Sequence, residues 1–300
     1  MPNTIGVSGD KTRLIKLTPA ELRFDLPTTT LAALEWGEPG ALPVLAWHGW
    51  LDNAGSFAPL ASSLSGIQLV AVDAAGHGLS GHRAADSSYN IWQDLSDILE
   101  LADQLGWERF GLIGHSRGAT VTSLFAGTFP DRVSHLALIE GGVPILGEPD
   151  DAPENLGRVL QRTRELRNRE GRIYASRERA VATRMDGFTP VTEEAAEILA
   201  RRSLREVRGG WQWHADQRLK AGSEFKLTRQ QAVAFLKRIA APTICYLAEE
   251  SPFADLGIYR ELLPLIANIE QHRLPGRHHL HMEDAAATIG RSLSQFFAAD

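Results

Sequence analysis

A glycine–x–serine–x–glycine pattern lies at Gly114-His115-Ser116-Arg117-Gly118. The apolar run Phe110–Ile113 predicts a buried strand before it, and the small residues of Ala119–Phe129 predict a helix after it. A sharp turn from strand to helix exposes a serine hydroxyl above a sheet, which is the geometry of a nucleophile elbow. We therefore predict that Ser116 is a nucleophile that attacks a carbonyl group.

Such a serine needs a general base and a binding site for the oxyanion that forms. The helix predicted after the turn would direct the backbone N–H of Arg117 toward that oxyanion, with support from the helix dipole. The base must come from another part of the chain.

Composition limits the class of protein. The chain has 300 residues, 43% hydrophobic residues and a net charge of −6, which favours one sizeable domain with an insertion and gives no electrostatic case for nucleic acid. The one cysteine, Cys245, cannot form an intramolecular disulfide, and its apolar surroundings favour an inert buried thiol. The first twenty positions mix polar and apolar residues, and no apolar run reaches 18 residues. We expect a cytoplasmic protein that does not bind membranes.

The elements that would position the serine alternate along most of the chain. Strands are expected at Thr12–Leu17, Thr30–Trp36, Pro43–Trp47, Ile67–Asp73, Phe110–Ile113, Val133–Glu140, Thr243–Leu247 and Ile269–Leu274. Helices are expected at Ser56–Leu64, Tyr89–Leu105, Ala119–Phe129, Gly257–Ile266 and Glu283–Phe297. This alternation predicts an α/β fold with a mostly parallel sheet flanked by helices.

The alternation stops between residues 143 and 236, where the chain becomes charged and helical. We predict a core of residues 1–142 and 237–300, and a helical cap of residues 143–236 inserted over the carboxyl edge of the sheet. A cap of this size suggests an enclosed pocket and a small to medium, partly apolar substrate.

Several motifs occur in an order that resembles one known family. His48-Gly49-Trp50-Leu51-Asp52-Asn53-Ala54 is similar to a stretch of the serine hydrolase-like proteins, which are capped members of the α/β-hydrolase fold superfamily. The segment from Asp73 to Ser80, the Ser116 motif and a late Gly-x-His follow in the same order as in that family. The resemblance covers nearly the whole chain and is weakest in the cap.

The resemblance implies roles for further residues. Enzymes of this fold place a second oxyanion donor after the strand that precedes His48-Gly49-Trp50, so the backbone amide of Trp50 should join that of Arg117. His48 is expected to bond nearby backbone, and His77 is expected to shape its loop because the base follows the nucleophile in this fold. The family's catalytic histidine follows a Gly-x pair, which selects His278 and leaves His279 as the alternative.

The acid that orients the base has two candidates. The family usually carries an aspartate where this chain has Ser251, within Ala248-Glu249-Glu250-Ser251-Pro252. Glu250 could replace that aspartate from the neighbouring position. Some relatives instead carry the acid where Glu140 ends a buried strand, and a buried carboxylate there needs a partner to offset its desolvation. We favour Glu140 over Glu250.

The cap contains aromatic residues that resemble a family segment. Trp211 and Trp213 precede Asp216 and Arg218 in a stretch similar to the one by which the family's chain returns from the cap. Trp50, Trp211 and Trp213 are candidates for substrate contact, although packing between cap and core would use the tryptophans equally well. Asp216 and Arg218 could simply pair with each other.

Together these residues predict a serine hydrolase that cleaves a small to medium carboxylic ester through an acyl-enzyme, with Ser116, His278 and Glu140 as its triad. We expect neither a cofactor nor a metal, because no carboxylate or thiol accompanies the histidines of residues 278–281 at the spacing of a structural zinc site. The same triad could hydrolyse C–C bonds, lactones or thioesters or transfer acyl groups, and a non-catalytic binding protein is a less favoured alternative. The substrate and the oligomeric state do not follow from the sequence.

Overall fold

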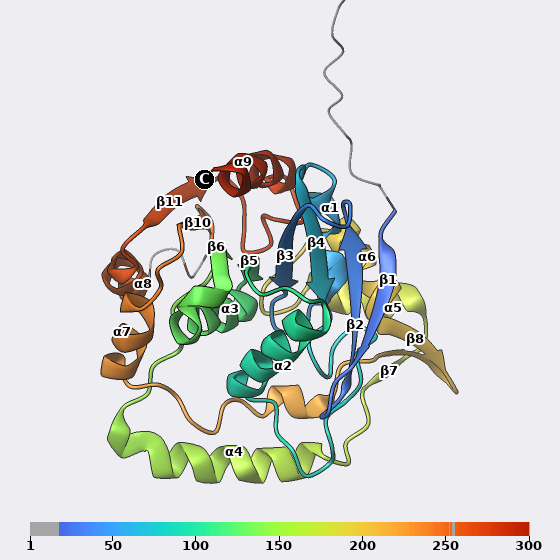
Figure 1. Ribbon diagram of the computed structural model, residues 1–300. Helices are drawn as coiled ribbons and strands as arrows, with labels where there is room; N and C mark the ends of the chain where they lie inside the picture. Colours follow the sequence, from blue (N-terminus) through green and yellow to red (C-terminus); the bar gives the residue numbers. More distant parts are fainter. Residues whose placement is uncertain (1–17, 252, 254–255, 300) are drawn as a thin grey trace, which may run out of the picture.

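A computed structural model describes residues 18–251, 253 and 256–299. The core is an eight-stranded sheet in the order β1-β2-β4-β3-β5-β6-β10-β11 (Figure 1). Its strands are β1 (Ala20–Asp25), β2 (Thr30–Trp36), β3 (Leu42–Trp47), β4 (Ile67–Val72), β5 (Phe110–His115), β6 (Val133–Ile139), β10 (Thr243–Ala248) and β11 (Ile269–Leu274). β2 runs antiparallel to both of its neighbours, and the other pairs are parallel, as predicted.

Helices cover both faces of this sheet. One face carries α2 (Ile91–Gln104), α3 (Arg117–Thr128), α7 (Arg229–Lys237) and α8 (Gly257–Leu262), and the other carries α1 (Ala58–Ala61) and α9 (Ala286–Ala298). Strand β3 shows how the sequence builds two cores, because successive side chains of a strand point to opposite faces. Leu45 and Trp47 join the cluster under α2 and α3, whereas Val44 and Ala46 join the cluster under α1 and α9.

The segment between β6 and β10 contains residues 143–236, which were predicted to form the cap and are called the cap segment below. It contains α4 (Ala152–Leu166), α5 (Arg177–Met185) and α6 (Glu193–Ser203), and the arrows of β3 and β4 point toward the side where α4 runs (Figure 1). The segment also contains a three-stranded antiparallel sheet that the sequence did not predict, made of β7 (Ile173–Tyr174), β8 (Leu204–Val207) and β9 (Gly210–Trp213). Strands of two to four residues are too short to show the alternation of apolar and polar residues by which a strand is recognised in a sequence. The limits of the cap at residues 143 and 236 stay a prediction.

The beginning of the chain differs from the expectation. Thr12–Leu17 lies outside the described residues, and the first strand of the described part of the chain is β1, where no strand was predicted. β1 is an edge strand in which only Leu22 and Phe24 are apolar side chains packed on the core. This short alternation is a weak signal in a sequence.

Among the residues that the structure describes, no helix is both long and apolar enough to cross a membrane. The cytoplasmic location stays a prediction.

Candidate active site

Ser116, His278 and Glu140 lie in one chain of hydrogen bonds. The Oγ of Ser116 is 2.9 Å from Nε2 of His278, and Nδ1 of His278 is 2.9 Å from Oε2 of Glu140. An ionised carboxylate only accepts, so Nδ1 of His278 carries the proton and donates it to Glu140. Nε2 is then free to accept the hydroxyl proton of Ser116, which is the arrangement that a general base requires.

The turn that carries Ser116 depends on tight packing. Ser116 has φ 52° and ψ −116°, lies between β5 and α3, and donates its backbone N–H to the carbonyl of Ile139 at 2.8 Å. A Cβ on Gly118 would overlap the carbonyl oxygen of Trp47, and a Cβ on Gly114 would overlap the Thr122 hydroxyl. The two glycines of the motif are therefore required by close backbone approach.

Glu140 stands at the end of β6 in a left-handed conformation, with φ 54°. Its Oε1 accepts a hydrogen bond from the backbone N–H of Ala248 at 2.6 Å, while Oε2 faces His278. The carboxylate is 1% exposed, and this pair of donors offsets its desolvation. The competing candidate, Glu250, is exposed at the start of the loop after β10.

Ser251, at the position where the family usually has an aspartate, is buried, and its hydroxyl accepts from the backbone N–H of Phe253 at 3.2 Å. It therefore serves the turn after β10. The geometry of the described residues thus brings Glu140 to the base from the neighbouring strand.

Burial shapes the electrostatics around the triad. Desolvation lowers the pKa of His278 below its ordinary value of 6.5, and the hydrogen bond that His278 donates to Glu140 opposes this shift. A neutral imidazole is the form that can accept a proton from Ser116. Burial, with a contribution from the charge of Glu140, raises the pKa of Cys245 to about 12, so this thiol stays protonated and unreactive at neutral pH.

The loop that should supply the second oxyanion donor is held by His48. Nε2 of His48 accepts from the backbone N–H of Ala74 at 2.9 Å, so Nδ1 carries the proton and donates to the carbonyl of Gly49 at 2.7 Å. His48 is thus a backbone-binding residue, as expected. Leu51 follows the predicted donor Trp50 with φ 62°, so the backbone turns sharply beside that amide.

The indole of Trp50 is 43% exposed and donates to the carbonyl of Leu219 at 3.0 Å. Leu219 lies in the 3₁₀ turn Gln217–Lys220, at the return from the cap segment. Trp213, by contrast, donates its indole N–H to the carbonyl of Ala180 and packs within an apolar cluster of the cap segment. Trp211 lies on β9, paired with Tyr174. A role in substrate contact stays a prediction for all three tryptophans.

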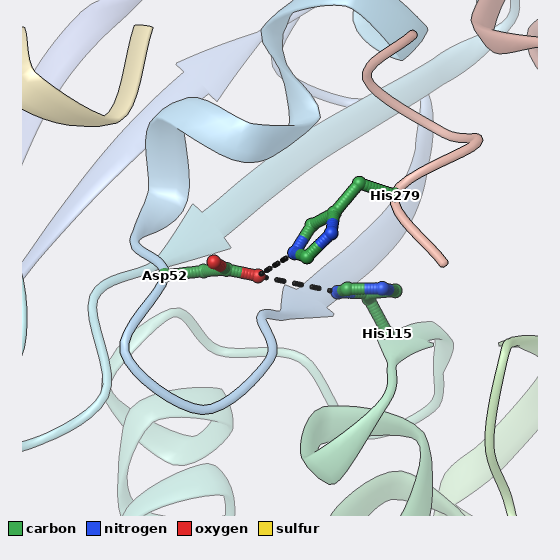
Figure 2. Close-up of side chains that lie close together, drawn as sticks. All are labelled: Asp52, His115 and His279. Carbon is green, nitrogen blue, oxygen red and sulfur yellow. Dashed lines mark hydrogen bonds and ion pairs between the residues drawn. The ribbon is translucent and has the colours of Figure 1, made fainter. Parts of the chain in front are cut away.

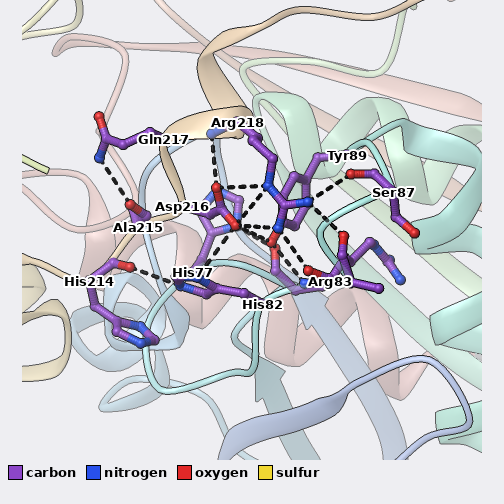
Figure 3. Close-up of polar contacts among 12 residues, drawn as sticks. His77, His82, Arg83, Ser87, Tyr89, His214, Ala215, Asp216, Gln217 and Arg218 are labelled. Atoms are coloured by element: carbon purple, nitrogen blue, oxygen red, sulfur yellow. Dashed lines mark hydrogen bonds and ion pairs between the residues drawn. The ribbon is translucent and has the colours of Figure 1, made fainter. Parts of the chain in front are cut away.

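Asp216 and Arg218 form a buried hub at the same return (Figure 3). Arg218 pairs with Asp216 at 2.7 Å and donates to the backbone carbonyls of Arg83, Ala84 and Ser87. The hydroxyl of Tyr89 donates to Asp216 at 2.8 Å. This hub fixes the cap segment to the loop before α2 and gives both residues a structural role.

A second polar cluster lies beside the triad and was not anticipated. Oδ2 of Asp52 is 3.4 Å from Nδ1 of His115 and 3.3 Å from Nε2 of His279 (Figure 2). The three ligand-type atoms lie within 4.8 Å of one another, so they are the described residues best placed to hold a metal. The guanidinium of Arg184 contacts both Asp52 and His279, and a fixed positive charge there opposes a cation.

Comparison with known proteins decides the family. The family profile described as alpha/beta hydrolase fold matches residues 43–285. The chain belongs to this α/β-hydrolase family. A crystal structure of a hypothetical protein from Pseudomonas aeruginosa PAO1 superimposes with a TM-score of 0.89 and 46% identity, covering 93% of this chain and 99% of that chain.

Curated relatives add a consistent description of this α/β-hydrolase. Serine hydrolase-like protein 2 of Homo sapiens is 29% identical over 285 residues, which are 88% of this chain and 90% of that protein. The serine hydrolase-like protein of Danio rerio is 27% identical over 288 residues, which are 92% of this chain and 88% of that protein. The fold and these names together support a hydrolase and agree with the family resemblance seen in the sequence.

Proposed function

We propose that this α/β-hydrolase is a serine esterase that cleaves small to medium carboxylic esters through an acyl-enzyme. The observation that supports the proposal most strongly is the unbroken hydrogen-bond chain from Ser116 through His278 to Glu140. A nucleophile, a base and an orienting acid in this order are the parts that acyl transfer requires.

In the proposed reaction, Nε2 of His278 takes the hydroxyl proton as Oγ of Ser116 attacks the ester carbonyl. The backbone amides of Trp50 and Arg117 stabilise the oxyanion of the tetrahedral intermediate. His278 then gives its proton to the departing alkoxide, which leaves as the alcohol. In the second half, His278 activates a water molecule that releases the acid from Ser116. Glu140 stays ionised and stabilises the imidazolium of His278 in both halves.

A serine nucleophile favours acyl chemistry over epoxide opening or dehalogenation, for which this fold uses a carboxylate at the same position. The size of the substrate is proposed from the cap segment, which is held to the core by Trp50 and by the hub of Asp216 and Arg218. A reaction site that lies beneath a cap suits small molecules rather than long polymers.

The test is a panel of p-nitrophenyl esters of increasing acyl length, assayed beside lactones, thioesters and diketones, with wild-type protein and Ser116→Ala. We expect short and medium esters to be the best substrates and Ser116→Ala to lose at least about 10³-fold in kcat. Turnover that survives in Ser116→Ala would contradict the mechanism. A clear preference for thioesters, lactones or diketones would move the proposal to that bond while keeping the triad.

A further inference from the structure

The polar cluster beside the triad is built from residues next to the reactive groups. His115 directly precedes Ser116, His279 directly follows His278, and Asp52 lies two residues after Trp50. The side chains of these three residues are between 0% and 2% exposed. A carboxylate placed there touches the three loops that carry the nucleophile, the base and the proposed oxyanion donor.

His115 links the cluster to the base itself. Its Nε2 lies 3.0 Å from the backbone carbonyl of His278, and a carbonyl only accepts, so Nε2 of His115 carries a proton and donates it. The other ring nitrogen, Nδ1, lies 3.4 Å from Oδ2 of Asp52 and has no hydrogen-bond partner among the described residues, so Asp52 and His115 are close neighbours without a hydrogen bond. The rings of His115 and His278 are 4.9 Å apart between centroids, so a tilt of one imidazole would displace the other.

The second residue of the His48-Gly49-Trp50 motif makes room for this pair. A Cβ on Gly49 would lie 2.8 Å from Oδ2 of Asp52 and 2.8 Å from Nδ1 of His115. Such distances are shorter than van der Waals contact, so only glycine leaves space for the carboxylate and the imidazole to meet. Glycine is thus required at position 49 by the packing of Asp52 against His115 as well as by the turn of the backbone.

The fourth member of the cluster comes from the cap segment. Nη2 of Arg184, on α5, lies 2.8 Å from Oδ1 of Asp52 and 3.1 Å from Nε2 of His279. A second nitrogen, Nη1, donates to the carbonyl of Thr189 at 3.1 Å, which keeps the guanidinium in place. The side chain of Arg184 is 14% exposed. The positive charge of Arg184 therefore lies next to buried Asp52 only when α5 is packed on the core.

We propose that Asp52, His115, His279 and Arg184 form a buried positioning cluster that aligns Ser116 with His278 and makes that alignment depend on docking of the cap helix α5. The proposal rests on the proposed function for its kinetic readout. Asp52 is a positioning residue in this account, because it acts through His115 and His279, and its hydrogen bonds and ion pairs among the described residues do not include Ser116 or His278.

Burial alone would raise the pKa of Asp52, but His279, His115 and Arg184 more than offset it, so its pKa lies well below the ordinary value. Asp52 is thus a carboxylate, and removing Arg184 would leave it buried without its guanidinium partner. Rearrangement of the loops that hold His115 and His279 is the expected response. A misplacement of about 1 Å at the triad costs on the order of 10²-fold in rate.

Four variants test the cluster by two readouts. Asp52→Asn and Arg184→Met remove one charge each, Arg184→Lys restores a cation, and Arg179→Met is the matched control on the exposed side of the same helix. The first readout is the second-order rate constant for labelling Ser116 with a fluorophosphonate. The second is the low-field proton resonance of Nδ1–H of His278, assigned by its absence in His278→Gln, which needs no turnover.

We expect Asp52→Asn and Arg184→Met to slow labelling on the order of 10²-fold and to shift or broaden the His278 resonance. Arg184→Lys should recover most of the rate, and Arg179→Met should match wild type. If Asp52→Asn fails to fold, Arg184→Met still tests the proposal, because Arg184 reaches the cluster from the cap helix α5 and its side chain is partly exposed.

Three outcomes separate the alternatives. The proposal would be overturned if Arg184→Met labels at the wild-type rate and its His278 resonance is unchanged. One zinc ion per chain in the purified wild-type protein, absent from Asp52→Asn, would overturn it in favour of a metal site. If wild-type protein does not label but the resonance shifts in Arg184→Met and not in Arg179→Met, the proposed function fails and the positioning cluster stands.

Discussion

Glu140 shows how a single side chain tunes the proposed base. Both of its oxygens are bonded, one to the backbone N–H of Ala248 and one to His278, so the carboxylate has little freedom to turn. Glu140 raises the pKa of His278, but burial of the imidazole lowers that pKa by more, so the net shift is downward. The protonation of His278 therefore depends directly on Glu140.

This balance predicts a pH profile. Because the pKa of His278 is below 6.5, the neutral base is present above that pH, and kcat/KM should fall along an acid limb with its midpoint below 6.5. Glu140→Gln removes the negative charge that raises the pKa of His278. The acid limb of the profile should therefore move to lower pH, and kcat/KM should drop by up to about 10⁴-fold. Glu249→Gln, in the exposed loop after β10, should keep the wild-type limb. An unmoved limb in Glu140→Gln would disprove this assignment.

At the scale of elements, the elbow between β5 and α3 positions Ser116 through close backbone contact. Gly118 lies at the start of α3 directly against the carbonyl oxygens of Trp47 and His48 at the end of β3. The turn, the helix and the loop of the proposed oxyanion donor thus meet at one residue without a side chain.

Two alanine substitutions separate this contact from helix propensity. Gly118→Ala should lower the free energy of unfolding by about 3 kcal/mol, because backbone atoms cannot move away from the new Cβ as a side chain could. Gly157→Ala, inside α4 with no atom near its Cβ position, should raise that free energy by about 0.5–1 kcal/mol. Urea denaturation measures both. Equal effects of the two substitutions would refute the packing argument.

The elements also show what a sequence can and cannot specify about the site. The elbow was predictable because its strand, turn and helix are local in the chain. For the acid, the sequence favoured Glu140 but left Glu250 as an alternative, because β6 and β10 are parallel neighbours and deliver both residues to the same edge of the sheet. Only the direction of the side chains separates the two. The contact of Asp52 with His279 joins residues 227 positions apart, and no local pattern predicts it.

Over the whole molecule, polar contacts hold the cap segment to the core at several places. Asn53 donates to the carbonyl of Leu199 and to the hydroxyl of Ser203 on α6. Arg202, also on α6, donates from Nε to Asp73 at 2.7 Å and pairs with Glu21 of β1. Asp73 is fully buried, and its desolvation is opposed first by the charge of Arg202 and then by hydrogen bonds from the backbone N–H groups of Leu79 and Ala54.

Removing one member of such a buried pair is costly. Arg202→Met should lower the free energy of unfolding by about 3–5 kcal/mol, a large part of the 5–15 kcal/mol typical of a folded protein. Arg201→Met, its exposed neighbour on α6, should change it by less than about 0.5 kcal/mol. Thermal and urea unfolding of the two variants provide the comparison, and similar midpoints would show that Arg202 does not compensate Asp73.

The alternation of strands and helices was predictable over most of the core, because buried parallel strands appear as apolar runs. The small sheet of β7, β8 and β9 was not, since its strands are very short and its pairing depends on how α5 and α6 bring it together. The half-exposed edge strand β1 was missed for a similar reason: its core contacts come from two side chains.

The most direct test of the catalytic assignment is labelling with a fluorophosphonate probe, comparing wild type with Ser116→Ala, Glu140→Gln and Glu250→Gln. We expect wild type to label, Ser116→Ala not to label, Glu140→Gln to label far more slowly and Glu250→Gln to label at nearly the wild-type rate. Slow labelling in Glu250→Gln with a normal rate in Glu140→Gln would contradict the account, and so would labelling that persists in Ser116→Ala.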